Sequence, residues 1–182
     1  MTSFTDRMIG AAKLDVRVYE EVEADIGATK QAMGVVLLAS LAGGVGTVGL
    51  STGSLGSVVI GGIAGLIGWV TWAFVTYIIG TRLLPESQTR ADVGELMRTL
   101  GFAQSPAVLR ILGGLSGVGP LVFSLTQVWL LVTMVVAVRQ ALDYSSTLRA
   151  VGVCLIGWVL STVIAIGLVL LLAGNLGDIT SQ

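Results

Sequence analysis

Residues 31–81 contain no charged side chain, and this run limits the possible folds more than any other feature of the chain. A helix needs about 20 apolar residues to cross the hydrocarbon core of a bilayer, so the run has room for two spans. Glycine and small polar residues gather at 49–56, and such residues favour a turn. We therefore predict a first span at about 32–50 and a second at about 57–80.

The composition also indicates a lipid environment. Hydrophobic residues make up 54% of the 182-residue chain and charged residues 12%, whereas soluble domains are about 25% charged. Glycine is frequent, with 25 residues, and glycine lets helices approach closely in membranes. The expected fold class is all-α, as a polytopic membrane protein.

A second uncharged run covers residues 111–138. The sequence Gly-Val-Gly-Pro at 117–120 is typical of a turn. It predicts a helical hairpin, with a third span at about 102–117 and a fourth at about 120–138. One long helix through the whole run is the alternative.

The remaining segments complete the expected organisation. A last apolar run predicts a fifth span at about 151–173, which makes 32–175 a bundle of five transmembrane helices, followed by a short tail at 176–182. Residues 1–31 show apolar side chains at helical spacing and predict amphipathic helices. Within residues 82–110, a second apolar pattern predicts a short amphipathic helix on the membrane surface, formed by Val93, Leu96, Met97 and Leu100.

The distribution of charge predicts the orientation. With five spans, every Lys and Arg except Arg110 falls in residues 1–30, 81–101 or 139–150, which would share one face of the membrane. Cytoplasmic loops carry such an excess of basic residues, so we expect a cytoplasmic N-terminus and an external C-terminus. Four spans would place Arg139 and Arg149 outside. The start of the chain does not look like a cleavable signal, and the expected location is the cell (inner) membrane.

The residue inventory argues against several chemistries. The chain has no histidine and one cysteine, Cys154, and most haem, zinc and iron sites use these side chains. No Asp or Glu lies in an expected span, whereas ion-coupled transporters usually need one there. We therefore predict no catalytic residues, no metal site and no cofactor. The net charge of -1 gives no basic excess for binding nucleic acid.

Arg110 is the most distinctive residue of the expected spans. A hairpin centred between Val118 and Gly119 would bring Arg110 to the membrane depth of Gln127. An arginine within the membrane is costly and suggests a functional site, here a buried polar pair that lines a cavity or lipid groove. The alternative is a short third span whose arginine extends its side chain to the headgroups.

Two further groups of residues are candidates for interactions. Small residues that permit close helix packing or dimerisation lie on one helical face or repeat at small-xxx-small spacing: Gly61, Gly65, Gly68, Gly113 and Gly117. An acidic cluster before the first span is a possible cytoplasmic docking surface, although such clusters are usually only solvated faces: Asp15, Tyr19, Glu20, Glu21 and Glu23.

Residues 14–32 and 96–106, which begin Leu-Asp-Val-Arg-Val-Tyr and Leu-Met-Arg-Thr-Leu-Gly, resemble prokaryotic members of the Yip-domain family, the Ypt/Rab-interacting membrane proteins. The resemblance implies five spans and a cytoplasmic N-terminus. Eukaryotic relatives act in vesicle trafficking and bind prenylated small GTPases. The sequence as a whole thus predicts a non-enzymatic membrane organiser or subunit of a membrane complex, which contacts membrane lipids and other membrane proteins or further copies of itself. A passive conduit for lipids or small solutes is the alternative.

Overall fold

The computed structural model describes residues 2–48, 55–115 and 117–180, and it describes side chains in these ranges except at 48, 55, 57, 58 and 164–180. The described residues are mostly helical and contain no strand. The elements, in order, are α1 (Phe4–Ala12), α2 (Val16–Ala24), α3 (Ala28–Val48), α4 (Leu55–Ile78), the π-helical turn η1 (Ile79–Leu83), α5 (Val93–Phe102), the 3₁₀ segment η2 (Ser105–Gly114), α6 (Gly119–Ala141) and α7 (Thr147–Thr180).

Three helical stretches of the described residues are long and apolar enough to cross a membrane. They cover Ala28–Thr47, Val59–Leu83 and Gly119–Ala141, which agree with the predicted first, second and fourth spans. The stretch Thr147–Val163 at the start of α7 is apolar but shorter. The protein is therefore an α-helical membrane protein by length and composition, and five full spans are not found in the described residues.

The predicted third span at 102–117 is wrong in form. Helix α5 ends at Phe102, and a separate 3₁₀ segment begins at Ser105 with Pro106 in its first turn. Proline cannot donate a backbone hydrogen bond, so it starts a helix more readily than it continues one. The segment η2 has 10 residues, which at about 2 Å per residue reach roughly 20 Å, less than the hydrocarbon core.

The predicted hairpin is present. The chain turns between η2 and α6, and Gly117 takes a positive φ of 85° there. Glycine adopts this backbone conformation without the steric cost that other residues incur. Helix α6 runs back beside η2, so the alternative of one long helix through 111–138 is wrong.

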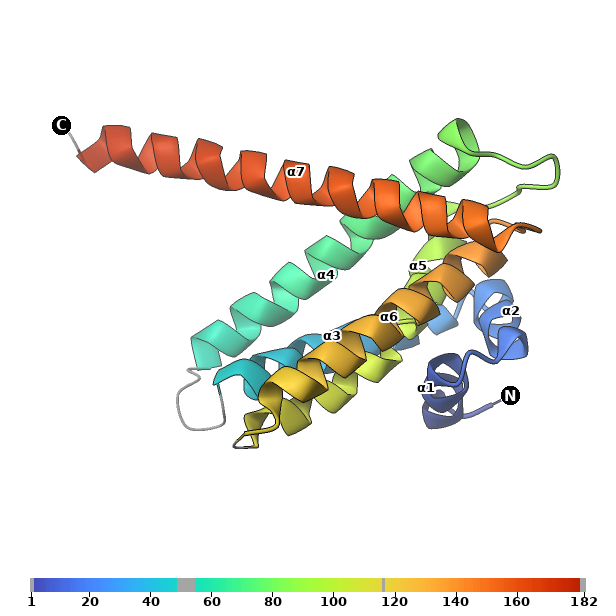
Figure 1. Cartoon of the computed structure of the whole chain (residues 1–182), viewed down its shortest axis with the longest axis horizontal. Helices are drawn as coiled ribbons and strands as arrows, with labels where there is room; N and C mark the ends of the chain where they lie inside the picture. The colour runs from blue at the N-terminus through green and yellow to red at the C-terminus, as the bar shows by residue number, and fades with distance from the viewer. Residues whose placement is uncertain (1, 49–54, 116, 181–182) are drawn as a thin grey trace.

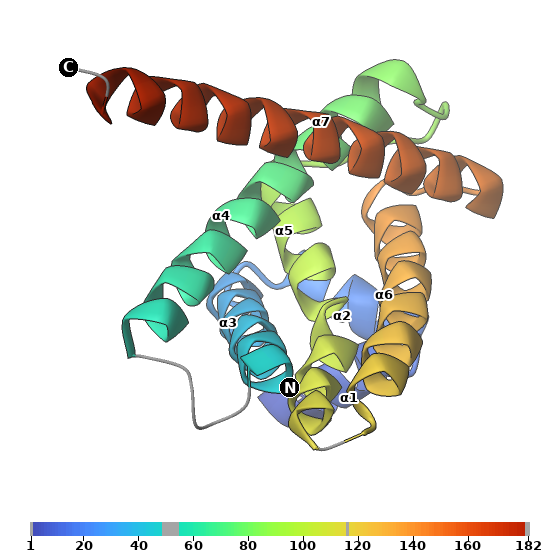
Figure 2. The same cartoon turned by 60° about the vertical axis from the view of Figure 1, so that its left-hand side comes forward.

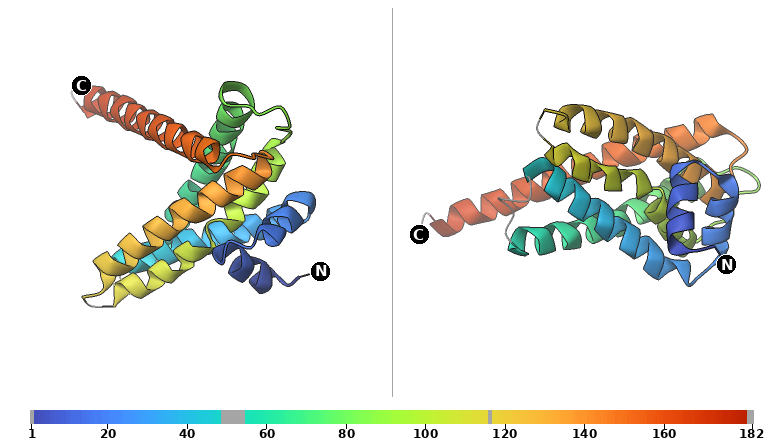
Figure 3. Two further views of the ribbon diagram at one scale, coloured as in Figure 1. Left: turned by 45° about the vertical axis from the view of Figure 1, so that its right-hand side comes forward. Right: turned by 90° about the horizontal axis from the view of Figure 1, so that it is seen from below.

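The ends of the elements fall into two groups (Figures 1 and 3). Helices α1 and α2, the connection at 84–92 and the turn at 142–146 lie together, and we call this side the charged end of the bundle. The η2–α6 turn and the last residues of α7 lie on the opposite side. Figure 2 shows α3, η2 and α6 side by side, with α4 and α7 crossing at an angle to them.

The predicted surface helix is instead an interior element. Helix α5 was expected on the membrane surface, but its Leu96, Leu100 and Phe102 are fully buried. It packs between α2, α3, α4 and α6. The apolar pattern identified the buried face correctly, and that face contacts protein rather than lipid.

Two other boundaries are informative. The predicted N-terminal amphipathic helices are present as α1 and α2. Helix α7 continues to Thr180, past the predicted end of the last span at 173 and into the predicted tail at 176–182; residues 181 and 182, like most of the predicted turn at 49–56, lie outside the described residues. The start of α7 is fixed by Glu86, whose carboxylate accepts hydrogen bonds from the backbone N–H groups of Ser145 and Ser146. The Ser145 hydroxyl donates to the same carboxylate, and this bond together with the two backbone bonds lowers the pKa of Glu86 to about 2.

Candidate functional site at the charged end of the bundle

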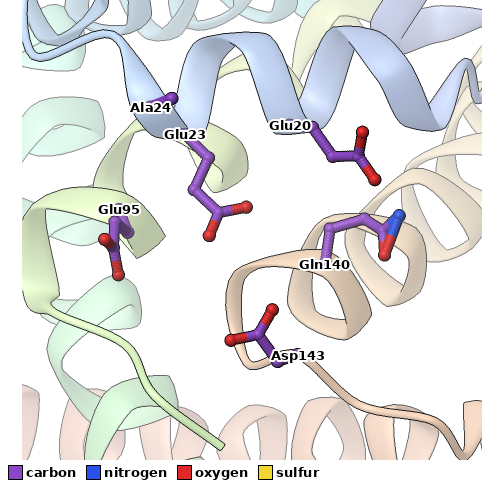
Figure 4. A pocket seen from close by; sticks show the side chains of 6 residues that line it. All are labelled: Glu20, Glu23, Ala24, Glu95, Gln140 and Asp143. Carbon is purple, nitrogen blue, oxygen red and sulfur yellow. The ribbon is translucent and has the colours of Figure 1, made fainter.

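A cavity of about 400 Å³ opens at the charged end, between α2, α5 and the end of α6. Figure 4 shows the side chains of Glu23 and Asp143 pointing toward one another across it, with Glu20 beside Gln140. Its lining is dominated by carboxylates, and comprises Glu20, Glu23, Ala24, Glu95, Gln140 and Asp143. Four acidic side chains from three separate segments therefore converge on one space.

Local backbone features place two of these carboxylates. Asp143 follows the end of α6 with a positive φ of 52°, a left-handed conformation that aspartate tolerates better than most residues. Glu95 is the third residue of α5 and forms a capping box with Asp92, with N···O distances of 2.8 and 2.9 Å. Capping fixes the first turn of α5 and with it the position of Glu95 at the rim of the cavity.

Arg98 is the cation nearest to Glu23, and its guanidinium is already engaged. Its side chain is 6% exposed. Its Nε donates to the carbonyl oxygens of Val22 and Glu23 at 3.1 and 2.9 Å, and Nη2 also donates to the Glu23 carbonyl. These are among the last carbonyls of α2, which carry the negative end of the helix dipole. Arg98 therefore joins α2 to α5 and binds backbone rather than the carboxylates.

Glu23 is the cavity carboxylate whose proton affinity is raised. Burial raises its pKa to about 7, and the negative charges of Glu95 and Asp143 act in the same direction. Arg98 opposes this increase, and Glu20 adds a smaller one. Like charges at short distance disfavour ionisation, as does removal from water. The Glu23 carboxyl is thus poised to gain or lose a proton near neutral pH.

A second set of contacts holds α1 and α2 to the rest of the bundle. Arg7 on α1 is 3% exposed and pairs with Glu21 and Asp25 at 2.8 and 2.9 Å. Its Nη1 also donates to Gln31 on α3 at 3.0 Å. The indole Nε1 of Trp129 on α6 donates to the carbonyl of Ala12 at 2.8 Å. One buried guanidinium and one indole therefore fix α1 against three helices.

The residues of the predicted docking surface lie in different environments in the structure. Glu20 and Glu23 face the cavity, whereas Glu21 pairs with Arg7, and Asp15 caps α2 and pairs with Arg17. The prediction that Tyr19 belongs to a docking surface is wrong. It is fully buried, and its hydroxyl donates to the carbonyl of Ala11 at 3.0 Å.

The sequence-based prediction missed three cavity residues, Glu95, Gln140 and Asp143. They lie more than 70 residues from Glu20 and Glu23 in sequence, so only the packing of α5 and α6 against α2 brings them together. The sequence offered one partial signal, the Asp92-x-x-Glu95 spacing of a capping box, which predicts a helix start but not its neighbours.

The predicted meeting of Arg110 and Gln127 is observed. Arg110 Nη2 donates to Gln127 Oε1 at 2.8 Å, and Nε donates to the Thr126 hydroxyl at 3.3 Å. The guanidinium carbon lies 5.7 Å from the centre of the Phe123 ring, within the range of a cation–π interaction. None of the ion pairs formed among the described residues includes Arg110. The arginine is thus held by neutral groups of α6 instead of extending freely to the headgroups.

An apolar groove of about 220 Å³ lies between α1, η2 and α6. Its walls include Met8, Ile9, Pro106, Leu109 and Trp129. Ile9 and Leu109 are 48% and 41% exposed. The groove is therefore continuous with the outward-facing apolar surface of η2 and α6.

The predicted packing glycines differ in how closely other atoms approach them. An added Cβ at Gly65 would collide with Ser40 on α3, and one at Gly113 would come within 2.6 Å of Phe123. Gly61 and Gly68 have no atom within 4 Å of such a Cβ in the described part of the chain. Gly117 also meets nothing, and its positive φ shows that it is a turn residue, so its prediction as a packing residue is wrong.

In the part of the chain that the structure describes, no three His, Cys, Asp or Glu side chains are placed to hold a metal ion together. The four cavity carboxylates therefore form no such group. Comparison with known proteins gave no matching family model, no matching curated protein and no matching solved structure.

Proposed function

We propose that this chain is a non-enzymatic integral membrane protein that organises other membrane proteins, as a scaffold or as a subunit of a complex. The observation that supports this best is the composite acidic cavity, built by α2, α5 and the end of α6. Buried arginines fix the helices around it, so the carboxylates are presented by a rigid framework. Preorganised surfaces bind partners with less loss of conformational entropy.

The proposal includes five membrane-crossing segments, with the charged end in the cytoplasm. The third segment, η2, is shorter than the hydrocarbon core and would cross by local thinning of the bilayer. The three long apolar helices, the η2–α6 hairpin and the apolar start of α7 support this arrangement. Nine of the ten Lys and Arg residues lie within residues 1–30, 81–101 and 139–150, which include the segments of the charged end, and Arg110 is the exception. Such a bias is typical of cytoplasmic loops. Membership of the Yip-domain family, from the resemblance of residues 14–32 and 96–106, is part of the same proposal.

The partner that best fits the cavity carries a basic cytoplasmic segment. The carboxylates at the cavity lie next to a single buried cation, Arg98, and that guanidinium is bound to carbonyl oxygens. A lysine or arginine of the partner would therefore supply the missing positive charge. Complementary charge of this kind contributes specificity and speeds association.

Photo-cross-linking in native membranes tests the proposal. A photoreactive amino acid replaces Glu20 at the rim of the cavity, and a control carries it at Leu148, which is 84% exposed on α7. We expect defined cross-linked products from position 20 that disappear at high salt and are absent from position 148. A protein that is monomeric and gives no product from position 20 would contradict the proposal.

Cysteine accessibility tests the orientation. Single cysteines at Ser116 and Ser145 are introduced into a Cys154→Ala protein. Five crossing segments with a cytoplasmic N-terminus predict labelling of position 116 from outside and of position 145 only after the membrane is permeabilised. The reverse pattern would refute the orientation, and labelling of both from one side would refute the crossing of η2.

A second candidate function, passive movement of lipids or small solutes, is favoured by the contact between Arg110 and Gln127. A polar pair within the membrane segment could lower the barrier for a headgroup or a solute. Reconstituted vesicles test this directly. Lipid scrambling or solute flux above that of protein-free vesicles, lost in Arg110→Leu, would support it. Absence of flux, or equal flux in the folded variant, would refute it.

A further inference from the structure

Two opposing sets of interactions determine how firmly the helix pair α1–α2 is attached to the bundle. Contacts of Arg7, Arg98 and Trp129 attach it. The cavity works against attachment, because Glu20 and Glu23 on α2 face Glu95 on α5 and Asp143 after α6. Like charges that face one another across a partly dry space repel. The strength of attachment must therefore depend on how many of these carboxyls are ionised.

We infer that the attachment of α1 and α2 to the rest of the bundle is pH-sensitive, tightening when Glu23 gains a proton and loosening when it loses one. Glu23 is the central group, because it is half-buried and lies opposite Asp143. The charged groups that act on it are Glu95, Asp143 and Glu20, and the one cation among them is Arg98.

The sign follows from the proton affinities of the two states. In a detached α2 the Glu23 carboxyl returns to water and to its ordinary pKa of 4.5, whereas in the attached state its pKa is about 7. Between these values the attached state binds more protons, so attachment weakens as the pH rises from 4.5 to 7. Below 4.5 the attachment is at full strength, and above 7 the loss is complete and constant.

The size of the effect can be bounded. Each unit of pKa difference corresponds to a tenfold change in an equilibrium constant. Because Glu23 is partly exposed and its repulsion is screened by water, we expect a change of about tenfold in the opening equilibrium between pH 5.5 and pH 8.5. Opening would expose the side chains of Tyr19 and Val22, which are now fully buried.

Titration of the cavity carboxyls should also affect binding of the proposed partner, an expectation that rests on the proposed function. A basic segment and a proton would compete for the same carboxylates, so partner binding at the cavity should weaken as the pH falls toward 5.5. The attachment equilibrium itself needs no partner and can be measured on the purified chain. The two ideas can therefore fail separately.

Hydrogen exchange of the protein in lipid nanodiscs, followed by mass spectrometry and corrected for the pH dependence of intrinsic exchange, tests the inference. We expect the protection of residues 4–24 to fall about tenfold from pH 5.5 to pH 8.5. Peptides from α6 serve as the internal control and should not change. Glu23→Gln should keep residues 4–24 equally protected at both pH values.

Asp143→Asn provides a second variant that keeps the fold, because asparagine also tolerates the left-handed conformation at 143. Removing the charge of Asp143 should move the midpoint of the loss of protection in residues 4–24 to lower pH. This variant therefore tests the inference even if Glu23→Gln does not fold. Protection of the wild-type helices that is independent of pH would overturn the inference. A pH dependence that persists unchanged in Glu23→Gln would overturn it as well.

Discussion

The charged end and the contact between α4 and α7 are built in different ways. At the charged end, buried polar side chains have partners: Arg98 binds the carbonyls of Val22 and Glu23 on α2, and the Tyr19 hydroxyl donates to the carbonyl of Ala11. At the α4–α7 side, by contrast, three buried polar atoms lack a hydrogen-bond partner in the described part of the chain, namely Trp72 Nε1, Thr76 Oγ1 and Ser161 Oγ.

This difference shows which contacts specify the structure. Hydrogen bonds to buried groups have strict geometry and are costly to leave unmade, so they fix how α1, α2 and α5 sit. The α4–α7 contact depends on the Trp72 ring lying against Gly157, which is close packing of apolar and small surfaces. Packing alone allows small shifts of α7 at lower cost. Substitutions at the two regions should therefore differ in size.

The largest expected effect is at Arg98. Replacing it with methionine keeps most of the volume but leaves the carbonyls of Val22 and Glu23 without their donors, and we expect a loss of about 3 kcal/mol in the stability of the attached α1–α2 unit. Arg17→Met is the matched control, because Arg17 is 87% exposed and pairs with Asp15, and a much smaller change is expected there because water screens an exposed ion pair. Hydrogen exchange of residues 4–24 measures both. Equal effects of Arg98→Met and Arg17→Met would mean that the buried hydrogen bonds of Arg98 contribute no more than an exposed ion pair.

Much of the membrane-embedded part could be predicted from the sequence, since uncharged runs of sufficient length have few alternatives in a lipid environment. The pairing of Arg110 with Gln127 could also be predicted, because a hairpin with a known turn fixes which residues share a depth. The position of α5 could not, since an apolar helical face faces lipid or protein with the same residue pattern. The cavity could not be predicted either, because Glu23 and Asp143 meet only through packing of helices far apart in sequence.

A smaller effect is expected where α4 crosses α3. Gly65→Ala would force a methyl group into Ser40, and overpacking of this kind costs about 1–3 kcal/mol. Gly68→Ala lies on the same helix with open space beside it, so the better helix propensity of alanine should make it neutral or stabilising by up to about 1 kcal/mol. Thermal unfolding in detergent compares the two. Equal destabilisation of both variants would mean that Gly68 also packs against protein, as in a dimer.

The smallest expected effect is the difference between substitutions at two tryptophans, Trp129 and Trp158. Trp129→Phe removes the hydrogen bond to the carbonyl of Ala12, which should cost about 1 kcal/mol and show as faster exchange in α1 alone. Trp158 on α7 is 62% exposed, and its replacement by phenylalanine should leave exchange in every helix unchanged. An effect of Trp158→Phe equal to that of Trp129→Phe would show that α7 is held as specifically as α1. The contrast between a hydrogen-bonded charged end and a loosely specified α7 would then have to be abandoned.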